Sequence, residues 1–95
     1  IIVVVLNDSD IIVVGTRVYI EAPHGLELVE PTEGVITLGV IEPKGGFKSA
    51  IFKLKIKWSF SGRITGWVVY RDYRNVRHTI ELEPMLPPPR RILRD

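Results

Sequence analysis

The residues that could do catalytic or metal chemistry are few and lie far apart in the sequence. His24 lies in a Pro-His-Gly turn, and His78 lies on the apolar face of the last predicted strand. A zinc site needs three or four ligands, usually with closely spaced pairs, and no two candidate ligands here have that spacing. Cysteine is absent, which removes disulfides and thiol chemistry. We therefore expect no metal site, and we expect His78 to be a partly buried strand residue with one ring nitrogen hydrogen-bonded.

The remaining polar groups form no catalytic motif either. No serine has a nucleophile-elbow context or a base placed to activate it. Glu81 and Glu83 lie on the solvent face of one predicted strand, whereas the paired acids of a glycosidase face a cleft. The segment 44–46 (Lys-Gly-Gly) lacks the Gly-Lys-Ser/Thr ending of a phosphate loop. The sequence predicts a protein that is not an enzyme and needs no cofactor.

A row of lysines is the first of two surfaces that could bind a partner. Lys53, Lys55 and Lys57 alternate with large apolar residues, so they share the solvent face of one strand. Arg17 would lie beside them if the second and fifth strands pair as in immunoglobulin-like folds. Such a row suits a phosphate backbone or an acidic partner. It equally suits a solvated outer face that resists aggregation.

The second surface depends on the register of the final hairpin. A three-residue loop at 73–75 puts Asn75 in the left-handed conformation that asparagine tolerates. Tyr70 then lies opposite His78 on the inner face, and the outer face gains an exposed tryptophan bordered by arginines, a composition typical of protein interfaces. The residues of this predicted surface are Trp67, Val69, Arg63, Arg71 and Arg77. A two- or four-residue loop would invert the face and bury the tryptophan.

The elements that must position these residues are strands. Valine and isoleucine supply 24 of the 95 residues, and side chains branched at Cβ favour pleated surfaces over helices. Period-two alternation and turn residues predict strands over residues 1–6, 11–14, 16–22, 26–29, 35–41, 52–58, 63–71 and 76–83. Within 52–58, Trp58 alternates with the lysines and should face the core. The pattern predicts an all-β, immunoglobulin-like Greek-key sandwich of seven to eight strands over residues 1–83.

The two ends of the chain differ in charge. Residues 1–43 carry one base and seven acids, a balance of −6, and residues 44–95 carry twelve bases and four acids, a balance of +8. Residues 84–95 are rich in proline and arginine, which predicts an appended linker or docking peptide that contributes little to stability.

Because the chain opens inside a strand at Ile1, we expect it to be part of a longer protein. Asparagine and glutamine side chains are few and charged residues are many, a composition that indicates a thermophilic, archaeal-type source. The low serine and threonine content favours a cytoplasmic location.

The strand and turn rhythm resembles the CARDB-type (cell-adhesion-related) immunoglobulin-like module of archaeal and bacterial proteins. The similar segments are VVVLNDSD at 3–10, VYIEAPHGLEL at 18–28, LGVIEPKGG at 38–46 and the strand 52–58. The resemblance covers roughly residues 1–82. It implies a Greek-key sandwich that serves as a non-catalytic spacer or interaction module, and it assigns no functional residues.

The function that these patterns favour is a non-catalytic interaction or spacer module that uses an outer sheet face for protein–protein contact. We expect a protein partner or self-association, and no membrane-spanning segment. The alternative is a nucleic-acid-binding module that uses the lysine row, and steep salt dependence would distinguish it.

Overall fold

The computed structural model describes residues 1–57 and 62–84. All regular structure in this part of the chain is β, as the sequence predicts, and every strand pairing is antiparallel. The strands are β1 (Ile2–Asn7), β2 (Val13–Glu21), β3 (Leu26–Glu30), β4 (Val35–Ile41), β5 (Gly46–Ile51), β6 (Lys53–Ile56), β7 (Thr65–Arg71) and β8 (Arg77–Glu81).

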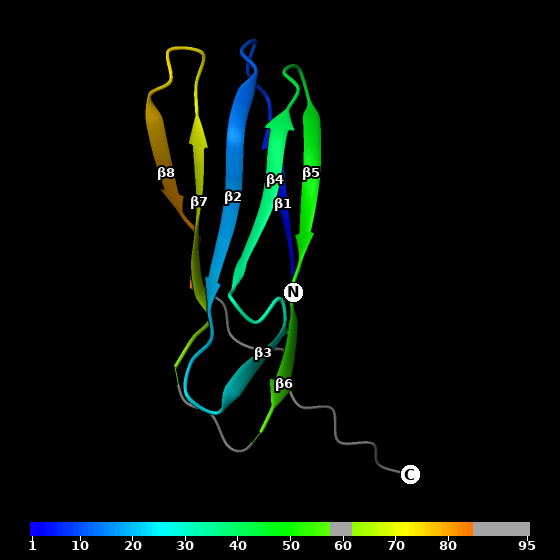
Figure 1. Ribbon diagram of the computed structural model, residues 1–95, viewed down its shortest axis with the longest axis vertical. Helices are drawn as coiled ribbons and strands as arrows, with labels where there is room; N and C mark the ends of the chain where they lie inside the picture. Colours follow the sequence, from blue (N-terminus) through cyan, green and yellow to red (C-terminus); the bar gives the residue numbers. More distant parts are fainter. Residues whose placement is uncertain (58–61, 85–95) are drawn as a thin grey trace.

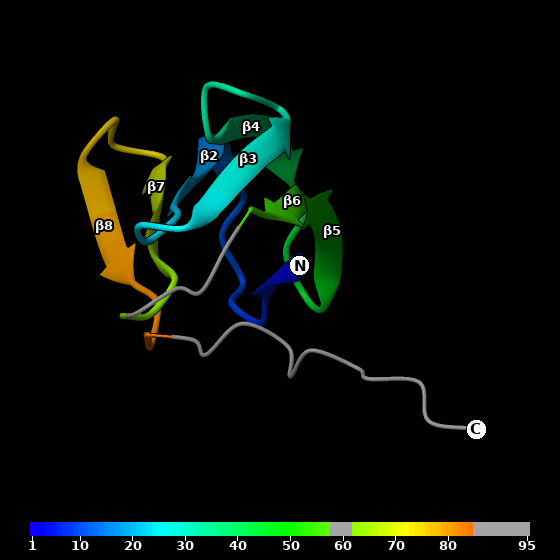
Figure 2. The same cartoon turned by 90° about the horizontal axis from the view of Figure 1, so that it is seen from below.

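The strands form one large sheet and two small ones. The large sheet has the order β4-β2-β7-β8, and these four strands lie side by side in Figure 1. The β1-β5 pair lies along its upper part, and the β3-β6 pair lies below it. Seen from below, β7 and β8 stand apart from β1 and β5 across the molecule (Figure 2).

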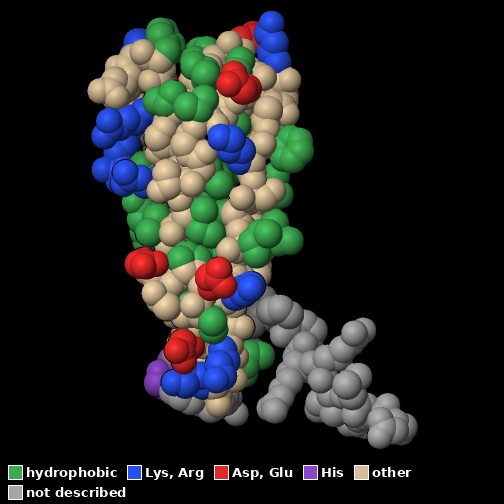
Figure 3. Space-filling view, turned by 45° about the vertical axis from the view of Figure 1, so that its right-hand side comes forward, with side chains coloured by type: hydrophobic (Ala, Val, Ile, Leu, Met, Phe, Trp, Pro, Cys, Tyr) green, Lys and Arg blue, Asp and Glu red, His purple; other side chains and the backbone are tan. Residues whose placement is uncertain are grey.

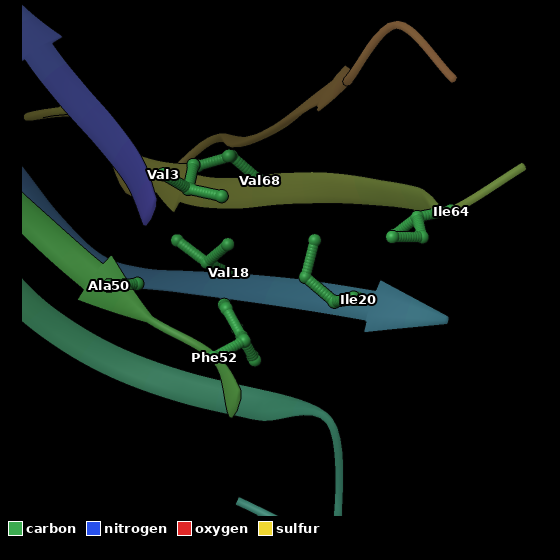
Figure 4. Close-up of a cluster of buried hydrophobic side chains, with 7 residues drawn as sticks. All are labelled: Val3, Val18, Ile20, Ala50, Phe52, Ile64 and Val68. Carbon is green, nitrogen blue, oxygen red and sulfur yellow. The ribbon is translucent and has the colours of Figure 1, made fainter. Parts of the chain in front are cut away.

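The core lies between the large sheet and the β1-β5 pair. In β2, Val18 and Ile20 are buried and Arg17 is exposed, as period-two alternation requires. Their partners come from β1, β5, β7 and the segments beside them. The buried cluster in Figure 4 comprises Val3, Val18, Ile20, Ala50, Phe52, Ile64 and Val68.

The middle of the chain departs from the predicted elements. The sequence pattern predicts no strand over residues 47–51, yet β5 begins at Gly46 directly after the turn. The predicted strand over 52–58 is shorter, because β6 runs only from Lys53 to Ile56. Phe52 lies at the junction where the chain stops pairing with β1 and begins pairing with β3. The predictions for Trp58 and for the proline-rich tail beyond Pro84 fall outside the described residues.

The final hairpin has the predicted register. Asp72 N–H donates to the Val76 carbonyl at 3.1 Å, and Asn75 has a φ of 63°. Tyr70 then pairs with His78, and Trp67 pairs with Glu81 on the opposite face. The three-residue loop is therefore confirmed, and it settles which face of β7 carries the tryptophan.

An irregularity in β2 shapes the same face. The short segment 11–14 continues into β2, and the register with β7 shifts between Val14 and Arg17. Gly15 lies in this shift with a φ of 61°, a left-handed conformation that glycine adopts without strain. A β-bulge of this kind redirects the side chains around it.

Candidate interaction surfaces

The outer side of the β1-β5 pair is an uncharged apolar surface, which we call the β1-β5 face. Five large hydrophobic side chains there are 58–67% exposed: Ile2, Val4, Leu6, Phe47 and Ile51. Cross-strand pairing brings Ile2 against Ile51, Leu6 against Phe47, and Val4 against Ser49. Hydrophobic side chains reach the surface at several places on the side shown in Figure 3.

The sequence of β1 explains this face. Val3 and Val5 point into the molecule, and the residues between them are just as apolar. A strand with one face in water needs only alternating apolar residues, whereas a continuous apolar run is typical of a strand covered on both faces. The described chain covers β1 on one face only. The continuous apolar run at residues 1–6 is the signal in the sequence for this surface.

Trp67, Val69, Arg71 and Arg77 of the predicted surface lie on the outer face of the large sheet, but Trp67 and Val69 are less open than predicted. Trp67 is half-buried and stacks on Tyr19 of the neighbouring strand, with ring centroids 5.1 Å apart and an interplanar angle of 11°. Val69 was expected to be open to a partner, but its side chain is only 8% exposed. It points outward, as predicted, yet its neighbours on the outer face cover it.

Three arginines from three adjacent strands surround a shallow hollow on this outer face. Arg17 comes from β2, Arg71 from β7 and Arg77 from β8, and all three are exposed. The cavity between them has a volume of about 290 Å³, and its lining also includes Tyr19, Val69 and Gly15. We call it the arginine hollow. Arg63 is exposed but precedes β7 and does not line this hollow.

The lysine row is solvent-exposed, as predicted, but its surroundings differ from the prediction. Lys53 Nζ lies 3.4 Å from Glu30 Oε2, and Lys57 Nζ lies 3.1 Å from Glu27 Oε2. These contacts arise because β6 pairs with β3. Arg17 was expected beside the row, but its strand pairs with β4 and β7 instead. The prediction failed because strand order depends on long-range pairing that local patterns do not encode.

A larger cavity of about 560 Å³ lies between β1 and the inner faces of β7 and β8. Its walls are mostly apolar, with Val3 and Val5 on one side and Val68, Ile80 and Leu82 on the other. It exists because the four-stranded sheet extends past the two-stranded β1-β5 pair. Thr16 Oγ1, in its lining, is buried and has no hydrogen-bond partner in the described part of the chain.

His78 and Asp72 form a polar pair at one end of this cavity. His78 Nε2 lies 2.8 Å from Asp72 Oδ2, so the predicted ring-nitrogen bond of His78 is confirmed. The hydrogen bond to His78, and then that from the Val76 backbone, hold the pKa of Asp72 below its ordinary value of 3.8. In residues 1–57 and 62–84, no three metal-ligating side chains come together. The same residues contain no helix long and apolar enough to cross a membrane.

Comparison with known proteins gives no relative: no family model, no curated protein and no solved structure matches the chain.

Proposed function

We propose that this chain is a non-catalytic protein-interaction module with an immunoglobulin-like Greek-key sandwich similar to the CARDB type. The observation that carries the proposal is the β1-β5 face. Contiguous apolar patches are rare on proteins that remain alone, and they mark sites of protein contact. Here the patch is uncharged across two paired strands, as the centre of an interface requires.

The geometry of the face suits a second flat sheet. Sheets pack face to face about 10 Å apart, with branched side chains interdigitating. The face offers large apolar side chains on both strands, with Ile2 and Ile51 at one end and Leu6 and Phe47 at the other. Because the face is uncharged, two copies can meet on it without repulsion, so self-association is a direct probe of its capacity for contact.

The first prediction concerns this face. A Leu6→Lys or Phe47→Lys variant places a charge in the patch, and we expect it to abolish self-association that the unchanged chain shows at roughly 0.1–1 mM, the range of a weak interface. Both side chains are more than half exposed, so the melting temperature should change little. Sedimentation velocity over a concentration series measures the association.

A matched control is Thr79→Lys, which adds the same charge to an exposed position of β8, in the four-stranded sheet. It should associate like the unchanged chain. An unchanged chain that stays monomeric throughout, or variants on the face that associate as well as the control, would contradict the proposal.

The nucleic-acid alternative receives no comparable support. Lys53 and Lys57 each contact a glutamate of β3, which offsets the positive charge that a phosphate backbone would meet.

A further inference from the structure

We propose that the arginine hollow binds one anionic group, a carboxylate or a phosphate, carried by an extended peptide segment of a protein partner. This site lies on the four-stranded sheet, away from the β1-β5 face, so it does not depend on the proposed function. Three features of the face support this site: the placement of the three arginines, the absence of acids facing them and the charge of the surrounding residues.

The first observation is that Arg71 and Arg77 are direct cross-strand neighbours. Arg71 and Arg77 form a non-hydrogen-bonded pair of the β7-β8 ladder. This register follows from the backbone hydrogen bonds of the neighbouring pairs, Asp72 with Val76 and Gly66 with Leu82. At such positions the Cα atoms are only about 4.5 Å apart and the side chains are closest. Like charges directly opposite each other destabilise a sheet. An anion between the two guanidinium groups would remove this repulsion.

The second observation is that the bulge in β2 leaves room for that anion. Arg17 lies on the same outer face, opposite Val69 of β7. Gly15 has no side chain, and a Cβ at its position would meet nothing within 4 Å. The outer face is therefore hollowed between Arg17 and the Arg71–Arg77 pair.

The third observation is that no acid neutralises these arginines. Within the described part of the chain, none of the three forms an ion pair, and Arg71 Nη1 donates only to the neutral amide oxygen of Asn75, at 3.4 Å. Guanidinium groups bind carboxylate and phosphate oxygens in bidentate fashion, which makes arginine the preferred residue for such recognition. The hollow thus offers three guanidinium groups, none of which is in an ion pair within the described part of the chain, to one oxyanion.

The residues next to the arginine hollow on the outer face of the four-stranded sheet indicate what kind of molecule carries the anion. Next to the hollow along the strands lies the Tyr19–Trp67 stack, and Glu81 lies beside it as the cross-strand partner of Trp67. Glu21, opposite Thr65, lies one step further along the same face. A polyanion following the strands would meet these glutamates. A peptide with an acidic group, then an apolar or aromatic residue, then a basic residue is complementary to all three zones. The charges of this face therefore favour a protein partner over a nucleic acid.

The test uses the full chain and a synthetic peptide, Gly-Asp-Asp-Phe-Thr-Lys-Gly, titrated at low salt. Chemical-shift changes in ¹⁵N spectra should include the Nε–H signals of Arg17, Arg71 and Arg77. Arg77→Gln should weaken binding about tenfold, the effect of losing one charge-assisted contact. The matched control is Arg74→Gln, which removes the same charge from an exposed turn residue outside the hollow. It should bind like the unchanged chain.

A second peptide with phosphoserine in place of the aspartates identifies the oxyanion. If it binds the same arginines more tightly than the aspartate peptide, the site is for phosphate, and if it binds more weakly, the site is for carboxylate. Inorganic sulfate at constant ionic strength should raise the melting temperature of the unchanged chain more than that of Arg77→Gln. Equal peptide binding by the two arginine variants, or no binding at millimolar peptide, would overturn the proposal. So would a single-stranded oligonucleotide that binds more tightly than both peptides through the same arginines. None of these results depends on whether Leu6→Lys alters self-association.

Discussion

At the scale of single residues, Asp72 organises the end of the final hairpin. One carboxylate oxygen accepts the backbone N–H groups of Arg74 and Val76 at 2.8 and 3.1 Å, and the other contacts His78. An aspartate that opens a turn in this way satisfies amides that no strand partner reaches. The carboxylate thus holds the register on which the outer face of the sheet depends.

This arrangement predicts how stability depends on pH. Because the pKa of Asp72 is lowered in the folded chain, the unfolded chain binds more protons as the pH falls toward 3.8. The stabilisation by Asp72 is therefore present above that pH and is lost as the pH falls through the folded pKa. Thermal unfolding between pH 2 and 7 should show a steeper acid loss for the unchanged chain than for Asp72→Asn. Parallel pH profiles for the two proteins would argue against this role.

At the scale of elements, the β7-β8 hairpin decides what the large sheet presents to a partner. Its register turns Trp67 outward and Val68 inward, where Val68 is only 4% exposed. The tryptophan is still not isolated, because it stacks on Tyr19 of β2. The stack links two strands on the solvent side, opposite the core.

Trp67→Ala should therefore destabilise the chain by an intermediate amount. Loss of the stack and of partial burial should cost about 1–2 kcal/mol, since an aromatic pair contributes roughly 0.5–1.5 kcal/mol beyond its buried area. Removal of a fully buried tryptophan would cost about 3–5 kcal/mol. Urea unfolding measures the free energy of unfolding of Trp67→Ala and of Val68→Ala, whose side chain lies on the opposite, inward face of β7. A loss above 3 kcal/mol for Trp67→Ala would show that the residue is part of the core.

At the scale of the whole molecule, one side chain joins the three sheets. Phe52 is 1% exposed and lies between β5 and β6, so it is adjacent to both small sheets while packing in the core beneath β2. Figure 4 shows it facing Val18 and Ile20. We expect Phe52→Ala to lower the free energy of unfolding by about 3–5 kcal/mol, as for a large core side chain. Calorimetry should show this loss, and Phe47→Ala, on the exposed face of β5, should change stability far less.

How far the sequence predicted the fold and the surfaces depends on how local each feature is. The strand at 16–22 and the turn at 73–75 follow from alternation and from the conformations of Asp72 and Asn75, which neighbouring residues determine. The pairing of β6 with β3 joins segments more than twenty residues apart, and no local pattern encodes it. For that reason the sequence pattern predicts Arg17 beside the lysine row, whereas its strand pairs with β4 and β7. The burial of Val69 likewise depends on neighbours from other strands.

The β1-β5 pairing also fixes how fast individual amides of β1 should exchange with solvent deuterium. Hydrogen bonds in both directions between Ile1 and Phe52 show which residues of β1 face β5. The amides of Val3 and Val5 then point to β5, whereas those of Ile2, Val4 and Leu6 point to the edge that no described strand covers. Exchange measured by NMR should therefore alternate, slow at Val3 and Val5 and fast at Val4 and Leu6. Uniform protection along β1 would reveal a further strand on that edge.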